Sequence, residues 1–287
     1  MDVDVPSLIS WLLSGDKELQ ITSLEYLCNA LLFTDDRGFV NKLDTTAIIN
    51  ALLLLFSEDN APDDVLELNA RTLLYLLEML DAPALRNIKI KHYKILCMRL
   101  DIADLSSSSG SELAQRIIKL LDFITSVEAG KPYFGGVLSS VLRFVRWHSE
   151  EVHADVIQSS MNIIHELCRR CEPGDKHMPE WMDSLSDLLS HNNYEVVVKK
   201  ALQSLGCIFE RFSTSGRDLS SIATNELITR LSHHLYKACG VFPDIRAPGL
   251  SLFYYPSFLE FATSYSPRQE DTSCKLDGFE TMGFFPR

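Results

Sequence analysis

The amino-acid sequence predicts an all-α fold, a right-handed superhelical solenoid of about five armadillo- or HEAT-like repeats. Three observations lead to this prediction. Amphipathic segments, short and long, follow one another along residues 1–239. The long segments share a register that recurs every 43 to 46 residues, with similar places for Ala70, Ala114, Gln158 and Ala201 and a looser fifth member at Leu24. No stretch before residue 240 alternates strictly between apolar and polar residues, as a half-buried strand does.

The element that defines the repeat is a long helix predicted over 60–80. Asn60 is expected to cap its first N–H groups, Pro62 to occupy its first turn, and Asp63 and Asp64 to favour the positive end of the helix dipole. Five apolar residues then share one face, Leu66, Ala70, Leu73, Leu77 and Leu80. Because residues 73–80 are apolar nearly all round, this helix must be covered on more than one side, as it is inside a stack.

The remaining helices follow from the same periodicity and from the breaks between segments. Shorter helices are expected at 4–14, 45–56, 83–91, 93–100, 137–147 and 178–190, and longer ones at 17–33, 111–126, 152–171, 193–212 and 221–239. The clearest break is Glu172-Pro173-Gly174-Asp175. Gly135-Gly136 is interpreted as a tight turn between two helices, in preference to a phosphate-binding nest.

The last part of the chain, 240–287, differs in composition from the repeats. It combines prolines and glycines with serine and aromatic residues and shows no helical period. We therefore divide the chain into an armadillo-like helical repeat domain, 1–239, and a non-repeat tail, 240–287, expected to be largely disordered. The alternative is a tail that derives from an alternative or truncated gene model, and a short linear binding motif is a further option.

Charge and composition exclude several classes of protein. The 287-residue chain has a net charge of −12, and residues 1–80 contain 4 basic against 14 acidic residues, which disfavours nucleic acid as a partner. The acidic N-terminus does not resemble a signal peptide, and the longest apolar run, Ala51–Phe56, is too short to span a membrane. Seven cysteines, an odd number, favour reduced thiols and a cytoplasmic protein, with the nucleus as the alternative.

The sequence lacks the common enzyme signatures, including the nucleophile elbow, the P-loop, the dinucleotide-binding glycines and the zinc-protease motif. One constellation resembles a metal site, His165-x-x-Cys168-x-x-Cys171 followed by His177. Steps of three along one helix turn the side chains away from one another, and no second half of the site is evident. We therefore interpret the cysteines as buried structural residues and expect no metal, no cofactor and no catalytic residue.

Basic residues on the long helices are the candidate contacts for protein partners, because long helices line the concave surface of armadillo-type solenoids. The candidates are Arg71, Arg116, Lys119, Lys199 and Lys200. Arg71 is also expected to pair with Glu67 one turn earlier. A second basic group could meet an acidic peptide, or could simply form a solvated face, which is the more common case. That group consists of Arg86, Lys89, Lys91, His92 and Lys94.

Four separated stretches, in the same order, resemble the N-terminal armadillo-like region of large HECT domain-containing E3 ubiquitin ligases. They are Asp2-Val3-Asp4 with Trp11-Leu12, Asn60 through Arg71, Leu113-Ala114 through Leu121, and Gly135-Gly136 through Val152-His153. The resemblance covers about 1–238. It implies an armadillo-like superhelix at the start of a multidomain ligase, followed by ankyrin repeats and by a HECT domain whose cysteine accepts ubiquitin.

The chain departs from that family because it stops before any ankyrin or HECT segment, so no cysteine can be assigned the thioester role. We therefore expect a non-catalytic region that binds substrates or partner proteins in the ubiquitination pathway, with no ligase activity of its own. The alternative is a free-standing armadillo-type adaptor for extended peptides. An import adaptor would show a ladder of tryptophan and asparagine on the long helices, where this sequence has only Asn69 and Asn162.

Overall fold

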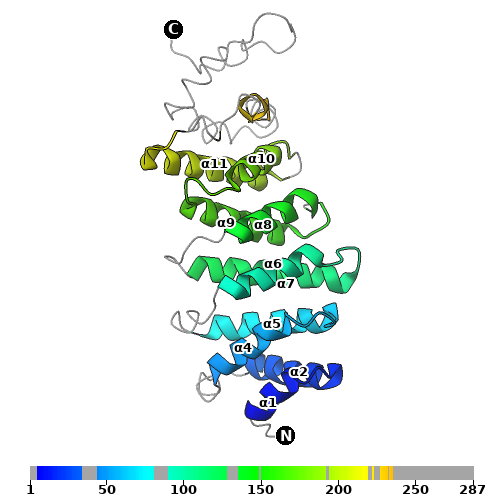
Figure 1. The fold of residues 1–287 in the computed structure, drawn as a ribbon. Coiled ribbons are helices and arrows are strands. Elements are labelled where there is room, and N and C mark those ends of the chain that lie inside the picture. The colour runs from blue at the N-terminus through cyan, green and yellow to red at the C-terminus, as the bar shows by residue number, and fades with distance from the viewer. Residues whose placement is uncertain are drawn as a thin grey trace, which may run out of the picture. The chain divides into compact units, whose positions relative to one another are not determined.

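The computed structural model describes residues 5–33, 44–80, 90–127, 135–148, 150–191, 194–218, 222, 227–231 and 233–234. The helices within these residues (Figure 1) are α1 (Val5–Leu12), α2 (Lys17–Phe33), α4 (Thr45–Leu55), α5 (Asp63–Met79), α6 (Ile90–Ile102), α7 (Ser108–Val127), α8 (Gly135–His148), α9 (Ala154–Arg170), α10 (Met178–Leu188) and α11 (Glu195–Ser215). The described residues contain no strand. The predicted all-α solenoid class is therefore confirmed, while its handedness stays a prediction.

The chain divides into two compact units, 1–170 and 171–287. In the first unit, each short helix packs on the long helix that follows it, in the pairs α1 and α2, α4 and α5, α6 and α7, and α8 and α9. The long helices form one layer, in which α5 lies against both α2 and α7, and α7 lies against α9 (Figure 1). The short helices form the other layer, with α1 against α4 and α6 against α8.

The second unit repeats the short–long pairing with α10 and α11, which pack on each other. Residues 227–231 and 233–234 are helical, within the range where the sequence predicts a further helix. Arg230 in this stretch pairs with Asp183 and Asp187 of α10, and Nδ1 of His234 lies 2.7 Å from the carbonyl oxygen of Ser186. No described helix in either unit combines the length and the apolar character needed to span a bilayer.

Local polar residues explain where several helices begin. Oδ1 of Asp16 accepts hydrogen bonds from the N–H groups of Glu18 and Leu19, at 2.9 and 3.3 Å, at the start of α2. Oδ1 of Asp44 caps α4 in the same way by accepting from Ala47 N–H at 3.0 Å. The hydroxyl of Ser107 accepts from the N–H of Gly110 at 3.0 Å in the first turn of α7.

The core of the stack agrees with the predicted register at three of four positions. Ala70, Ala114 and Ala201 are fully buried on their long helices. Gln158 is not: it is half-buried, and its Nε2 donates to Oδ1 of Asn162 at 3.0 Å, whereas Ser160 is fully buried. The prediction for Gln158 is wrong by one residue: Ile157 is the fully buried residue, and it lies 43 residues after Ala114, whereas the prediction placed the position 44 residues after it.

Two further predictions about helix starts are wrong. Asn60 does not cap α5: the helix begins at Asp63, its N-cap is Pro62, and no side chain provides a cap hydrogen bond. The extended backbone of Pro62, with ψ 152°, fixes the start instead. Gly135 and Gly136 do not form a turn between helices but the first turn of α8.

Several predictions lie outside the described residues. These are residues 83–89 of the short helix predicted at 83–91 and the tail 240–287. The division of the chain into 1–239 and 240–287 therefore stays a prediction.

Candidate protein-interaction site

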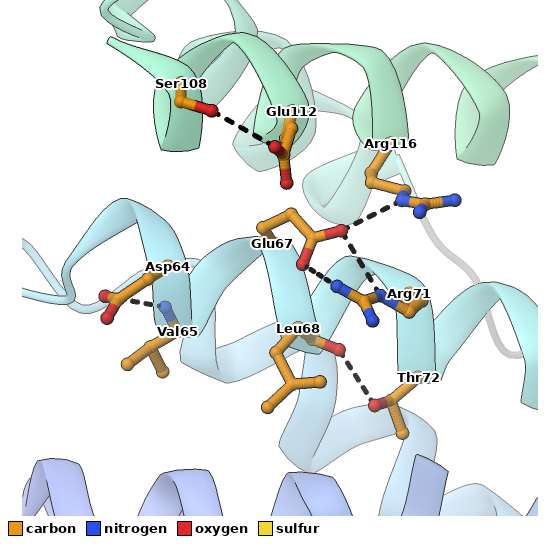
Figure 2. A network of polar contacts seen from close by, with 9 residues as sticks. All are labelled: Asp64, Val65, Glu67, Leu68, Arg71, Thr72, Ser108, Glu112 and Arg116. Atoms are coloured by element: carbon orange, nitrogen blue, oxygen red, sulfur yellow. Dashed lines mark hydrogen bonds and ion pairs between the residues drawn. The ribbon is translucent and has the colours of Figure 1, made fainter.

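A network of ion pairs and hydrogen bonds in the first unit is centred on Glu67 of α5 (Figure 2). Its side chain is only 7% exposed, yet it holds a carboxylate. Arg71, one turn later on α5, approaches with Nη2 2.5 Å from Oε2 and Nε 3.3 Å from Oε1. Arg116 reaches across from α7 and donates from Nε to Oε1 at 2.9 Å. We call Glu67, Arg71 and Arg116 the Glu67 cluster.

The two arginines lie side by side because α5 and α7 are neighbouring long helices. Their side chains are 34% and 32% exposed, so the guanidinium groups keep N–H donors at the surface while Glu67 fixes their positions. The hydrogen bond to Glu67 raises the pKa of Arg71 above its already high usual value. Fixed, partly exposed guanidinium groups are suited to binding a carboxylate of a partner protein.

The neighbourhood of the cluster extends to α2 and along α7. Cys28 of α2 is buried, and this burial raises the pKa of its thiol, although a hydrogen bond with Thr72 opposes the shift. The hydroxyl of Thr72 donates to the carbonyl oxygen of Leu68 at 2.8 Å. On α7, Oγ of Ser108 donates to Oε1 of Glu112 at 3.2 Å, which places an exposed acidic residue beside the cluster (Figure 2).

The five basic residues predicted to contact protein partners are distributed over the two units. Arg71 and Arg116 meet at Glu67, and Lys119 follows Arg116 on α7, half-buried and without an ion pair among the described residues. Lys199 is exposed and Lys200 half-buried on α11, in the second unit. The predicted Glu67–Arg71 pair is present. The role of all five residues in binding stays a prediction.

The sequence reasoning missed Glu67 as the centre of the site. It recognised the pair within α5 but not the link to Arg116, which lies 49 residues away. That separation is close to the repeat length. The sequence therefore did contain a signal for the contact: an acidic residue on one long helix, followed about one repeat later by a basic residue on the next.

Only some residues of the second basic group, which was predicted around α6, lie at the surface. Lys91 and Lys94 are exposed on α6, whereas His92 is 3% exposed. The predicted solvated face is therefore wrong for His92, because this position faces the interior of the stack. Arg86 and Lys89 lie outside the described residues.

The cysteines of the motif that resembles a metal site are buried, as expected for structural residues. Cys168 and Cys171 are fully buried. Burial raises the pKa of Cys171 to about 11, so its thiol stays protonated near neutral pH. Nδ1 of His177 lies 3.5 Å from Oε2 of Glu180, at the start of α10. Across the described part of the chain, no three His, Cys, Asp or Glu residues form a group that could hold a metal ion.

The asparagines relevant to the adaptor alternative are not arranged as a peptide-binding ladder. Asn69 is fully buried, and its Nδ2 donates to the carbonyl oxygen of Leu52 on α4 at 2.9 Å. Asn162 accepts from Gln158 on its own helix. Asn69 therefore links α5 to α4 instead of contacting a peptide.

Two of the known proteins that resemble this chain are E3 ubiquitin-protein ligases. Over 245 residues the chain is 34% identical to the E3 ubiquitin-protein ligase Ufd4 of Drosophila melanogaster, which is 83% of this chain but 9% of that protein. Over 252 residues it is 32% identical to the E3 ubiquitin-protein ligase hecd-1 of Caenorhabditis elegans, 86% of this chain and again 9% of the relative. The chain thus spans about a tenth of the length of either protein.

Other comparisons add little. No family model matches the chain. The crystal structure of an engineered protein aligns with a TM-score of 0.46 and 16% identity, over 86% of this chain and 98% of that one.

Proposed function

We propose, on the premise that this chain is homologous to a segment of HECT-type E3 ubiquitin ligases, that it is a non-catalytic region that binds substrates or partner proteins for ubiquitination. The premise itself is established by the two relatives, which confirm the resemblance predicted from the sequence. The observation that supports the proposal best is that the similarity extends over 83% of the chain and so includes most of the first unit, 1–170.

The Glu67 cluster is the surface we propose for binding. Arg71, Arg116 and the neighbouring Lys119 place three positive charges on adjacent long helices, against Glu67 and Glu112. These five residues carry three positive and two negative charges, whereas the chain as a whole has a net charge of −12. This face would favour acidic segments of a partner, since complementary charges accelerate encounter and fix the orientation of the bound protein.

The binding part of the proposal can be tested with a variant that leaves the Glu67 cluster intact. Lys119→Glu reverses one charge on this face, and Lys176→Glu makes the same change at an exposed position in the loop before α10. Proteins retained from a cell extract by the immobilised chain would be quantified by mass spectrometry. We expect Lys119→Glu to lose a defined subset of partners by about tenfold, as expected for a contact worth about 1.4 kcal/mol. Identical sets for both variants would contradict the proposed surface.

The non-catalytic part has a separate test. The chain would be incubated with ubiquitin, activating enzyme, conjugating enzyme and ATP, and analysed without reducing agent. We expect no ubiquitin adduct that is released by thiol. A stable thioester on any of the seven cysteines would overturn this part of the proposal.

A further inference from the structure

The second unit contains two cysteines that the proposed function does not use, Cys171 and Cys207. Cys171 is the first residue of this unit and is fully buried, whereas Cys207 lies on α11 and is half-buried. The other three cysteines that the structure describes are buried, namely Cys28, Cys97 and Cys168. Among these five residues Cys207 is therefore the one that an oxidant reaches most easily.

Two arginines at the C-terminal end of α11 contact the segment that begins at Cys171. Nε of Arg211 donates to the carbonyl oxygen of Cys171 at 3.2 Å. Arg217, just after α11, places its guanidinium group over Gly174, where an added Cβ would clash with it. Cys207 lies one turn before Arg211 on the same side of α11, so this side of the helix faces the segment at Cys171.

The two thiols also influence each other electrostatically. Burial is the main cause that raises the pKa of Cys171 to about 11, while the positive charge of Arg211 opposes the shift and the charge of an ionised Cys207 adds to it. Because the interaction of two charges weakens with their separation, this effect requires the thiols to be neighbours. It agrees with the contact made by Arg211, and both observations bring Cys171 and Cys207 together.

We propose that Cys171 and Cys207 form an oxidative modification site, in which hydrogen peroxide converts the two thiols into one disulfide. The sulfur of Cys207 attacks the peroxide, the O–O bond breaks, and Cys207 becomes a sulfenic acid with release of one water. The sulfur of Cys171 then attacks the sulfenic sulfur and the S–O bond breaks. The hydroxyl group leaves with the thiol proton of Cys171 as a second water, so one peroxide is reduced while two thiols are oxidised.

The order of these steps follows from the surroundings of the two residues. Cys207 is accessible to a small oxidant, whereas Cys171 is buried and protonated near neutral pH, which suits it to the second step rather than the first. The disulfide would fasten α11 to the loop before α10 and should stabilise the second unit, since a cross-link restricts the unfolded chain. The site shares no residue with the Glu67 cluster and is independent of the proposed function.

The test uses the full 287-residue chain, which is reduced, treated with hydrogen peroxide, blocked with N-ethylmaleimide and digested with trypsin without reduction. Cleavage after Arg169 and Arg170 separates Cys171 from Cys168, so mass spectrometry distinguishes these two cysteines. We expect peptide 171–176 to be linked to peptide 201–211, and dithiothreitol to release both. The oxidised chain should also unfold at a higher urea concentration than the reduced chain.

Three variants identify the role of each cysteine. Cys207→Ser should abolish the linked peptides, and Cys171→Ala should leave Cys207 as a sulfenic acid that dimedone labels more strongly than in wild type. The matched control is Cys168→Ala, which removes a buried thiol three residues before Cys171 and should preserve the linkage.

Circular dichroism would verify that each variant is folded, and the peptide map of the wild-type chain remains decisive if one is not. Linkage of Cys207 to a cysteine other than Cys171 would overturn the proposal. So would a sulfinic acid at Cys207 of the wild-type chain without any linked peptide, or a linkage that forms only when urea is present during oxidation.

Discussion

Replacement of Glu67 by glutamine should destabilise the first unit by about 2 kcal/mol. The substitution keeps the shape of the side chain and removes the one negative charge between Arg71 and Arg116. Hydrogen bonds to a charged group contribute about 1.5–3 kcal/mol, and breaking a fully buried ion pair costs about 3–5 kcal/mol. The lower end of these ranges applies, because both arginines are about one third exposed and water can solvate them once they are released.

The measurement is urea unfolding followed by far-UV circular dichroism, combined with hydrogen exchange to locate the change. Faster exchange should appear in α5 and α7, which the cluster joins, while α10 and α11 of the second unit should be unaffected. A double-mutant cycle with Arg116→Gln should give a coupling of about 1 kcal/mol. The same cycle with Arg71→Gln separates the contact within α5 from the contact between repeats.

The control is Glu25→Gln on α2, where the carboxylate is exposed, and its effect should stay within about 0.5 kcal/mol. A loss for Glu67→Gln no larger than that of the control would refute the reasoning. It would mean that the cost of burying the carboxylate offsets its attraction to both arginines, as occurs for some buried ion pairs.

Three further predictions concern local structure. Gly110→Ala should cost about 1–3 kcal/mol in the unfolding free energy of the first unit, because the new Cβ would clash with the backbone oxygen of Asp104. The hydrogen bond from Lys17 lowers the pKa of Asp64 below 3.8, so Asp64 stabilises the fold above that pH and loses its contribution as pH falls through its folded pKa. Asp64→Asn should therefore cost less than about 1 kcal/mol at pH 7, and its cost should decrease as pH falls below 3.8, in a series of urea titrations. Burial raises the pKa of Cys97 to about 12, so iodoacetamide should modify it only when urea unfolds the chain, as read by peptide mass spectrometry.

Each of these predictions has a comparison that would contradict it. Gly136→Ala, where the added Cβ meets no atom within 4 Å, should be neutral or stabilising, and equal losses at both glycines would argue against the close contact. A loss for Asp64→Asn that does not decrease as pH falls below 3.8 would exclude the ionised carboxylate as its cause. Cys207 is only half-buried, and it should be modified before Cys97 in the folded protein.

The helices were largely predictable because their signal is local. Apolar residues at steps of three and four define the buried face of α2, which spans Lys17–Phe33 as the sequence indicates. Helix starts were less predictable, since several residue types can cap and the backbone decides among them. Asn60 has a suitable side chain, yet the chain stays extended through Pro62 and the helix begins after it.

The candidate site was predictable only where it is local. The Glu67–Arg71 pair lies within one turn of α5 and follows from spacing alone. The burial of Glu67 and its contact with Arg116 depend on how α7 stacks on α5. The periodicity of the sequence gives the register of that stacking only to within a few residues. The same uncertainty misplaced Gln158, because an error of one residue rotates a helix by about 100°, and Gln158 lies next to the fully buried Ile157.

Three arginines supply the directional contacts that apolar stacking lacks. Arg99 donates from Nε to the carbonyl oxygen of Phe56 at 2.7 Å, Arg170 from Nη2 to that of Thr125 at 3.1 Å, and Arg211 from Nε to that of Cys171 at 3.2 Å. The partners lie 43, 45 and 40 residues apart, about one repeat.

Each acceptor lies at or next to the C-terminal end of a helix, where carbonyl groups lack partners within the helix and the dipole favours a cation. A buried carbonyl left unpaired costs about 1–3 kcal/mol, so a stack displaced by one turn would lose these bonds even if its apolar contacts survived. The arginine–carbonyl bonds within each unit therefore select one register among those that bury similar apolar area. In the first unit that register is also what places Arg116 within reach of Glu67, and with it the two guanidinium groups of the proposed binding surface side by side.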